Sequence, residues 1–562
     1  MQNKWEVKKY DENMIEKIKK KFNVSTLTAK FLIARNIEYK DMANFLYGKL
    51  ENLRDPYLIK DMDKLVERII FAKENNEKVC IYGDYDVDGI TSIVVFYKFL
   101  RELNIDVSYY LPDRLTDGYG LNKKGLDEIK KRDVSLVITV DCGITAIEEI
   151  EYAKELGMDV CVTDHHECGV DLPNAIAIVN PKQIDDKSYF KMHAGVGVVF
   201  KCICAIAKKY DLEEYMYFKY LDIVAIGTIS DIVPLVDENR IISKFGLRQL
   251  NNTSNVGIKA LLSKLKYKNI DSIMVSFSMA PRINACGRMG DASIAVELLL
   301  EENLDKASEL ADRLNELNVL RQEVEKKIFD QAVEMIQREG FDKKNSLVLY
   351  DKDWHNGVIG IVASRLVSLY NKPVILITKE NGVLRGSGRC PVGFSLYEAA
   401  SNCKDLLVQF GGHELAIGFS IEEDKIEKFR ECFEKIASME ENIVCEKIIE
   451  VDAEIFREDL NSNLLRDVRF LKPYGQSNKA PNLLYKNLKV VGIRTLKEEK
   501  HLKFVLKDER TLIEGIAFMQ GQRRDDVLVG DKIDIVTQVD LNDFNGKKTL
   551  QFIIQDFKKS VI

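Results

Sequence analysis

Residues 79–89 read Val-Cys-Ile-Tyr-Gly-Asp-Tyr-Asp-Val-Asp-Gly, an apolar run that ends in three alternating aspartates. Two similar runs follow: Leu136–Val140 ends in Asp141-Cys142-Gly143, and Val160–Thr163 ends in Asp164-His165-His166. Each run is short and rich in β-branched residues, which predicts a buried β-strand. Acidic or imidazole side chains therefore follow the ends of three successive strands.

The segments between these strands have a helical period. Ile90–Leu100 follows the first strand and Ile144–Leu156 follows the second, so strands and helices alternate. This order predicts parallel βαβ units in a doubly wound α/β domain. Since the carboxyl ends of parallel strands face one crevice, we expect the acids to meet there.

These acids need a counter-charge. Asp84, Asp86 and Asp88 alternate, so in an extended chain they project to one side, and Asp141 adds a fourth carboxylate. Carboxylates this close raise one another's pKa unless cations intervene. Carboxylate oxygens with imidazoles and no obligatory thiolate favour Mn²⁺ or Mg²⁺ over structural zinc. We therefore predict two divalent ions and phosphoester hydrolysis.

The first aspartate patch alone would also fit a calcium loop or a solvated turn. A calcium loop carries glutamate at its twelfth position, but the twelfth residue from Asp84 is Val95. Three patches at successive strand ends favour the catalytic metal site over both alternatives.

Longer motifs continue along the chain. They are G-D-Y-D-V-D-G-I from residue 83, T-D-H-H-E from 163, A-I-G-T-I-S-D-I-V-P-L from 225, A-P-R-I-N-A-C-G-R-M from 280, W-H-N-G-V-I-G from 354, and G-G-H from 411. Their order and spacing resemble the DHH phosphoesterase family and, within it, the bacterial exonucleases specific for single-stranded DNA. The resemblance covers nearly the whole chain.

The resemblance implies ligands for two Mn²⁺ or Mg²⁺ ions. They are Asp86, Asp88, Asp141, His165 and Asp231, with Asp84 as a further candidate. Asp141 would bridge the ions and help catalysis, His166 would face the phosphate, and Asp164 would orient His166.

Two positions leave alternatives open. Many relatives carry a histidine where this chain has Tyr82, and Asp84 would take its place. Asp222 competes with Asp231, which we favour because it lies in the Gly-Thr-Ile-Ser-Asp turn.

Candidate DNA-binding residues combine side-chain donors with glycines that let the backbone approach a phosphate. They are Arg282, Asn284, Arg288, His355, Arg385, Arg389, Gly411, Gly412, His413 and Lys503. Without the resemblance, the two glycine-rich segments would be read as tight turns.

The chain of 562 residues is too long for one core. We expect a helical leader packed on the catalytic domain (1–55), a DHH catalytic domain (56–300), a long connecting helix (301–340), a DHH-associated α/β domain (341–440) and an OB-fold domain that binds single strands (441–562). Within the last segment, five short strands with no long helix between them predict the barrel. Candidates there to contact DNA are Lys503, Phe504, Phe518, Arg523, Arg524 and Phe544.

Composition adds broader bounds. The net charge of −7 argues against a nonspecific nucleic-acid coat but allows a nuclease, because a phosphate track needs only local basic residues. No apolar run approaches membrane-spanning length, and the first 20 residues are not signal-like. The eleven cysteines form no framework, so we expect a cytoplasmic monomer with free thiols.

The resemblance implies 5′-to-3′ digestion of single-stranded DNA to mononucleotides, in recombination and repair, beside a helicase and a single-strand-binding protein. One alternative is a DHH phosphodiesterase of short oligonucleotides or cyclic dinucleotides, which would lack the barrel. The other is a non-catalytic DHH scaffold for replication, against which the intact ligand set counts.

Overall fold

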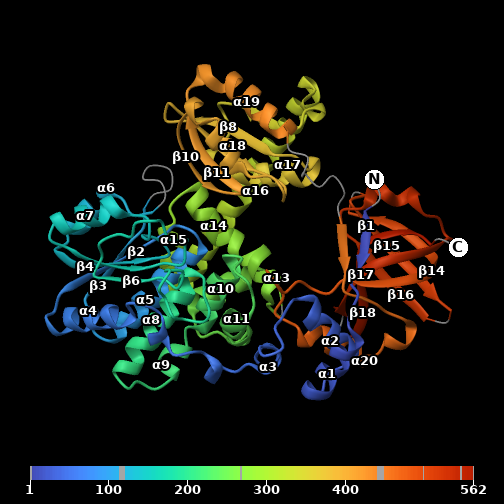
Figure 1. Cartoon of the computed structure of the whole chain (residues 1–562), viewed down its shortest axis with the longest axis horizontal. Coiled ribbons are helices and arrows are strands. Elements are labelled where there is room, and N and C mark those ends of the chain that lie inside the picture. The colour runs from blue at the N-terminus through green and yellow to red at the C-terminus, as the bar shows by residue number, and fades with distance from the viewer. Residues whose placement is uncertain are drawn as a thin grey trace.

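The computed structural model describes residues 3–112, 120–265, 267, 269–439, 448–497, 499–509, 511–544 and 547–560. Three lobes surround a central gap between the ribbons in Figure 1: the blue and green lobe that carries the first sheet, the yellow and orange lobe above it, and the red barrel. The helix α16 (Leu304–Glu339) runs from the first lobe to the second. Its bounds agree with the connecting helix expected from the sequence.

The first lobe contains a parallel five-stranded sheet. Its order is β3 (Val107–Tyr110), β2 (Lys78–Gly83), β4 (Val134–Val140), β5 (Asp159–Thr163) and β6 (Ala177–Val179). All four neighbouring pairs are parallel, which confirms the doubly wound fold. The chain passes from β2 to β3 on one side and then to β4 on the other, so the order reverses between β2 and β4. Ligands bind at such a reversal in open α/β sheets.

Side chains that alternate along the strands pack under helices on both faces of this sheet. Val79 and Ile81 pack with the helices α4 (Met62–Glu74), α5 (Val87–Glu102) and α8 (Gly195–Lys209). Cys80 and Tyr82 point to the other face, toward α6 (Lys123–Lys130) and α7 (Ile147–Glu155). A strand buried on both faces reads as a continuous apolar run, which is why the sequence pattern was visible.

A helical subdomain follows the sheet. It comprises α9 (Tyr215–Phe218), α10 (Leu221–Ser230), α11 (Asp237–Leu250), α12 (Val256–Leu265), α13 (Ser272–Met274), the π-helical turn η3 (Val275–Met279), α14 (Ala280–Met289) and α15 (Ser293–Leu300). None of the described helices is both long enough and apolar enough to span a membrane.

The second lobe is a mixed sheet in the order β10 (Leu407–His413), β11 (Ala416–Ile421), β9 (Val383–Arg389), β8 (Val374–Glu380) and β7 (Leu347–Tyr350). The helices α17 (Asn356–Tyr370), α18 (Leu396–Asn402) and α19 (Ile426–Met439) cover it. The helix α18 ends at Asn402, and β10 begins at Leu407. The reading of the glycine-rich segments as tight turns was wrong, because both belong to strands. A Cβ atom on Gly386 would lie 2.2 Å from the Phe419 ring, so this glycine makes room for packing.

The red lobe is a closed barrel. Its strands run in the order β13 (Ala453–Glu454), β14 (Leu483–Leu496), β15 (His501–Asp508), β16 (Thr511–Ala517), β18 (Lys547–Lys559) and β17 (Lys532–Phe544). The pairing of β14 with β17 closes the barrel, which confirms the OB fold. The expected boundary between residues 440 and 441 falls outside the described residues.

The leader packs on a different surface from the one we expected. Strand β1 (Lys4–Val7) pairs in parallel with β12 (Ile448–Val451). The helices α1 (Glu12–Phe22), α2 (Thr26–Ala34) and α3 (Met42–Tyr47) share one apolar core with the barrel and its preceding helix α20 (Ser462–Phe470). The end of the leader also contacts the catalytic lobe: Asn44 and Arg54 bind Asp237, and Phe45 O accepts a hydrogen bond from Arg240. An amphipathic pattern shows that a helix face is buried but not which core covers it.

Candidate active site

The strand ends around the β2/β4 reversal bring the predicted ligands together. Three groups of side chains each have one ligand atom per residue within 4.8 Å of the others. They are Asp84 with Asp86 and Asp141, Asp88 with His165 and Asp231, and Asp141 with His165 and His166. The groups overlap at Asp141 and His165, so these two residues lie at the centre of the cluster.

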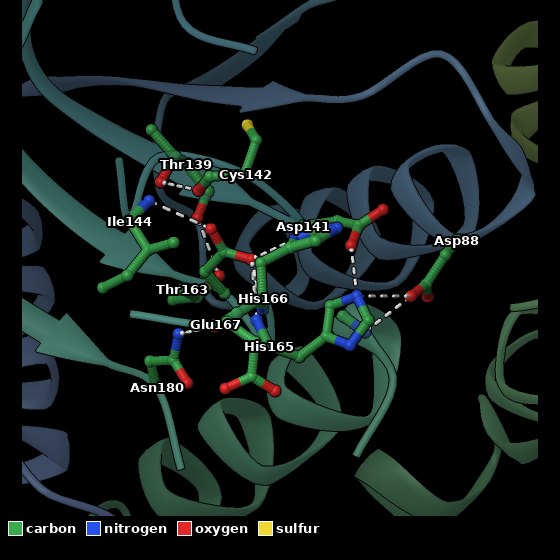
Figure 2. Close-up of polar contacts among 12 residues, drawn as sticks. Asp88, Thr139, Asp141, Cys142, Ile144, Thr163, His165, His166, Glu167 and Asn180 are labelled. Atoms are coloured by element: carbon green, nitrogen blue, oxygen red, sulfur yellow. Dashed lines mark hydrogen bonds and ion pairs between the residues drawn. The ribbon is translucent and has the colours of Figure 1, made fainter. Parts of the chain in front are cut away.

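His165 makes the closest approach within the cluster (Figure 2). Its Nε2 lies 3.0 Å from Asp141 Oδ1 and 3.8 Å from Asp88 Oδ2. The same atom lies 3.7 Å from Asp231 Oδ2. The side chain is nearly buried, and burial together with the charge of His166 lowers its pKa to about 3. A neutral imidazole is the form that ligates a metal.

Two helix N-termini hold the acids of the first patch. Asp86 caps α5, where its Oδ1 accepts hydrogen bonds from the amides of Asp88 and Gly89. The carboxylate of Asp88 accepts from Gly195 N at 2.6 Å and Val196 N at 2.8 Å, at the start of α8. The partial positive charge of a helix N-terminus stabilises a carboxylate in these positions.

Asp141 occupies a tight corner. Its backbone is left-handed, with φ of 58°, and its amide donates to Thr163 O on the neighbouring strand. A Cβ atom on Gly195 would lie 2.6 Å from Asp141 Oδ1. Only glycine at residue 195 therefore lets α8 approach this carboxylate.

Negative charge is in excess in this cluster, which adds to burial in raising the pKa of its carboxyl groups. Burial raises the pKa of Asp88 and of Asp141, and neighbouring carboxylates raise both further. Burial and then Asp86 raise the pKa of Asp231 to about 7. Asp141 Oδ1 and His165 Nε2 are buried and make no hydrogen bond with the described residues. Oxygen donors in excess, a neutral imidazole and orphaned buried atoms fit divalent cations.

Asp164 holds the second histidine. Its Oδ1 lies 2.7 Å from His166 Nδ1 and accepts from two backbone amides, and its Oδ2 accepts from Ile144 N (Figure 2). Burial opposes ionisation of Asp164, but the hydrogen bond and charge of His166 outweigh it and lower its pKa. Burial likewise opposes protonation of His166, yet the bond to Asp164 raises its pKa. Asp164 therefore orients the His166 ring and favours its protonated form next to the ligand cluster.

The structure shows where the two alternative ligand positions, Tyr82 and Asp222, lie. Tyr82 is fully buried and donates to Gly120 O, while Asp84 joins a ligand group. Asp222 is buried on α10, where it accepts a hydrogen bond from Thr253. It belongs to none of the ligand groups found among the described residues, whereas Asp231 lies within reach of His165.

A cleft of about 700 Å³ separates the catalytic lobe from the second lobe. Four predicted DNA-binding residues line it: Arg288, Arg385, Arg389 and Gly411. Tyr85 also lines the cleft, and it stands between the ligand candidates Asp84 and Asp86, so the cleft opens beside the cluster. We missed Tyr85, Asn356 and Ser387 in the sequence, although Tyr85 could have been found from its place between two aspartates.

The other predicted DNA-binding residues lie elsewhere. Asn284 accepts from Val87 N, Arg282 donates to Asn315, and His355 caps α17. Gly412 and His413 line a separate, open hollow with Tyr397 and Glu414. Lys503, on the barrel, pairs with Glu514.

The barrel side chains divide into core and surface. Phe504 is fully buried and packs edge to face on Phe557, and Arg523 is held by Asp526 and Asp556. Phe504 therefore belongs to the barrel core, and Arg523 is engaged by two acids of the barrel. Phe518 is 52% exposed. The Phe544 side chain lies outside the described part.

Comparison with known proteins matches the three lobes one by one. Residues 78–228 match the DHH family, N-terminal domain; residues 343–439 match the DHHA1 domain; and residues 451–556 match the RecJ OB domain. The single-stranded-DNA-specific exonuclease RecJ of Bacillus subtilis is 37% identical over 98% of this chain and 70% of its own length. The chain belongs to the RecJ family. The RecJ of Escherichia coli K12 is 32% identical over 89% of this chain and 90% of its own.

The RecJ fold extends over the whole chain. The crystal structure of Thermus thermophilus RecJ in complex with Mn²⁺ superposes with a TM-score of 0.85 at 27% identity, covering 100% of this chain and 80% of that one. The corresponding complex with Mg²⁺ has a TM-score of 0.80. The lobes and barrel described above are thus the RecJ architecture.

Proposed function

We propose that this protein is an exonuclease that digests single-stranded DNA from 5′ to 3′ and releases mononucleotides, with two divalent ions at the active site. The observation that carries the proposal is the overlap of three ligand groups directly beside a cleft with three arginines. Relatives at 31% to 37% identity that bear the name single-stranded-DNA-specific exonuclease RecJ support it.

The residues present fit Mn²⁺ or Mg²⁺, the ions of the two Thermus complexes. Asp84, Asp86 and Asp141 would hold one ion, and Asp88, His165 and Asp231 the other. Asp141 approaches His165 to 3.0 Å and would bridge both sites. When bound, the ions would polarise the scissile phosphate and lower the pKa of a water molecule for in-line attack.

His166 would contact the scissile phosphate. Its Nδ1 is held by Asp164, which fixes the ring beside the ligand cluster. Because Asp164 raises the pKa of His166, it favours the protonated ring, whose charge would stabilise negative charge that develops on the phosphate. The ring also lies within the group of Asp141 and His165, so the alternative role is that of a metal ligand.

The cleft would hold the strand. Arg288 donates to Gly357 O at 2.9 Å, which ties the two lobes together across the cleft floor. Arg385 and Arg389 lie on the same face of β9, opposite its buried glycines, and both line the cleft. Single-strand phosphates would bind these arginines while the end of the strand reaches the ligand cluster.

We propose a division of labour that follows the expected segments. Residues 56–300 and 341–440, joined by 301–340, would hydrolyse the strand, and residues 441–562 would grip it. The protein would act as a monomer in the cytoplasm, together with a helicase and a single-strand-binding protein. The barrel argues against a dedicated oligonucleotide or cyclic-dinucleotide phosphodiesterase, and the complete ligand set argues against a scaffold.

The test uses strands labelled at the 5′ or the 3′ end, a blunt duplex and a dinucleotide, each with protein stripped by EDTA and reloaded with Mn²⁺ or Mg²⁺. We expect immediate release of labelled mononucleotide from the 5′-labelled single strand and delayed release from the 3′-labelled one. Preference for the dinucleotide would favour the small-substrate alternative. Hydrolysis of no substrate with either ion would favour the scaffold.

A further inference from the structure

A second cavity lies where the leader, the catalytic lobe and the link to the barrel meet. It has a volume of about 390 Å³ and shares no lining residue with the active-site cleft. Its walls are Leu46 of α3, the second half of α11, residues 270–272 at the start of α13, and residues 469–474 at the end of α20. The sequence motifs do not touch it.

The lining is strongly basic. Lys244 and Arg248 come from α11, and Arg469 and Lys472 come from the opposite wall. Behind them lies Arg240, which is 2% exposed. Its guanidinium donates to the backbone carbonyls of Phe45, Phe470, Leu471, Lys472 and Pro473, at 2.8 to 3.5 Å. Carbonyls satisfy its hydrogen bonds but leave its charge in place.

Few acidic side chains lie close to these cations. Asp271 and Asp540 both lie beside Lys472, at 3.9 and 3.6 Å. Within the part of the chain that the structure describes, no ion pair involves Lys244, Arg248 or Arg469. Lys244 lies 3.4 Å from Gly48 O, and both Lys244 and Arg248 lie over the ring of Phe245. Burial and the charges of Arg240 and Arg248 lower the pKa of Lys244, as expected where positive charge is in excess.

The walls also offer apolar surface. Phe470 is 36% exposed at the rim and is held edge to face by Tyr47. Leu46, Leu247 and Pro473 add further apolar lining. Arginine forks match phosphate oxygens, aromatic rings stack on bases, and a volume of this size falls in the range of small-ligand sites.

We propose that this cavity binds the phosphate and base of a nucleotide, either free or as one unit of a single strand. Such a ligand would neutralise cations of the catalytic lobe and of the barrel link at the same time. It would therefore hold the barrel against the catalytic lobe. The site is independent of metal chemistry and of the function proposed above.

The test removes charge from the cavity without touching the active site. Lys244→Gln with Arg248→Gln forms the cavity variant, and Arg469→Gln, whose side chain is exposed, is a second variant on the opposite wall. Lys130→Gln with Lys154→Gln removes the same charge from exposed positions on α6 and α7 and is the matched control. Full-length protein in EDTA is titrated with inorganic phosphate, with 5′-dAMP and with a 20-residue oligothymidylate.

We expect both cavity variants to bind at least tenfold more weakly than the control, with unchanged thermal unfolding. Weaker binding of dAMP and phosphate would identify a free nucleotide as the ligand. Weaker binding of the oligothymidylate alone, with a salt slope reduced by about 0.7 for each phosphate that the variant no longer binds, would identify the strand. Equal affinities of wild type, control and both variants for all three probes would overturn the proposal. Failure of the proposed nuclease function would show separately, as absence of hydrolysis by the wild type with Mn²⁺.

Discussion

Replacement of Asp141 by asparagine separates the role of this carboxylate in metal binding from its effect on the stability of the metal-free protein. The asparagine keeps the shape of the corner but removes the charge that belongs to two of the three ligand groups. Because both ions would lose a ligand, we expect hydrolysis to fall at least a thousandfold, or about 4 kcal/mol of transition-state stabilisation. The metal-free protein should nevertheless become more stable.

The stability gain follows from the spacing of the carboxylates. For ligand atoms 4.8 Å apart, the repulsion of one carboxylate pair is roughly 3.5 kcal/mol at an effective dielectric constant of about 20. Bound protons relieve part of it, since burial and neighbouring carboxylates raise the pKa of Asp141 and of Asp88. We therefore expect the free energy of unfolding of the metal-free catalytic lobe to rise by about 1 to 3 kcal/mol at pH 8.

The assay pairs denaturant unfolding in EDTA with hydrolysis of a 5′-labelled strand in saturating Mn²⁺. Asp222→Asn is the matched control, because Asp222 is also a buried aspartate of this lobe but lies outside the ligand groups. The control should keep hydrolysis within about threefold of wild type. Turnover of Asp141→Asn within tenfold of wild type at saturating metal would refute the bridging role.

Three further predictions follow from the same site and from the barrel. His166→Ala should lower turnover about a hundredfold while calorimetry still counts two bound ions, and loss of one ion would make His166 a ligand. The pKa of Asp231 is about 7 in the folded protein, above its ordinary value of 3.8. Protonation of Asp231 therefore stabilises the folded state fully below pH 4, and this stabilisation is lost as pH rises through 7. Metal-free protein should thus lose up to about 4 kcal/mol of stability between pH 4 and pH 8; Asp231→Asn should flatten this dependence in denaturant titrations, and an unchanged slope would exclude Asp231 as its source. The double variant Phe518→Ala with Arg524→Ala, on the barrel surface, should weaken binding of long single strands and reduce the salt dependence of that binding. Hydrolysis of a trinucleotide should not slow. Unchanged affinity for long strands would assign the barrel a role other than strand binding.

The sequence predicted the parallel sheet and the ligand cluster because both leave local signals. Runs such as Leu136–Val140 mark buried strands, and Asp141 follows at the strand end, so the topology alone brings it to Asp86. Asp231 was harder to choose over Asp222, since both border the same helix and only the fold turns one of them toward His165.

Other features depend on partners distant in sequence. The glycines of β9 look like turn residues, but their role is set by Phe419 and Ile417 on β11. Phe504 and Phe518 have similar sequence surroundings, and only barrel closure decides that the first is core and the second is surface. The core shared by leader and barrel likewise has no local signature.

The pairing of β1 with β12 sets the order in which the molecule can be built. Lys4 aligns with Ile448, so more than four hundred residues must leave the ribosome before the first strand finds its neighbour. At synthesis rates of about 5 to 20 residues per second, this wait is on the order of tens of seconds. During that interval the catalytic lobe can fold, whereas Ile15, Ile18 and Phe31 have no barrel to cover them. The leader is therefore the segment that newly made chains expose to chaperones, and closure of the barrel is the event that ends this exposure.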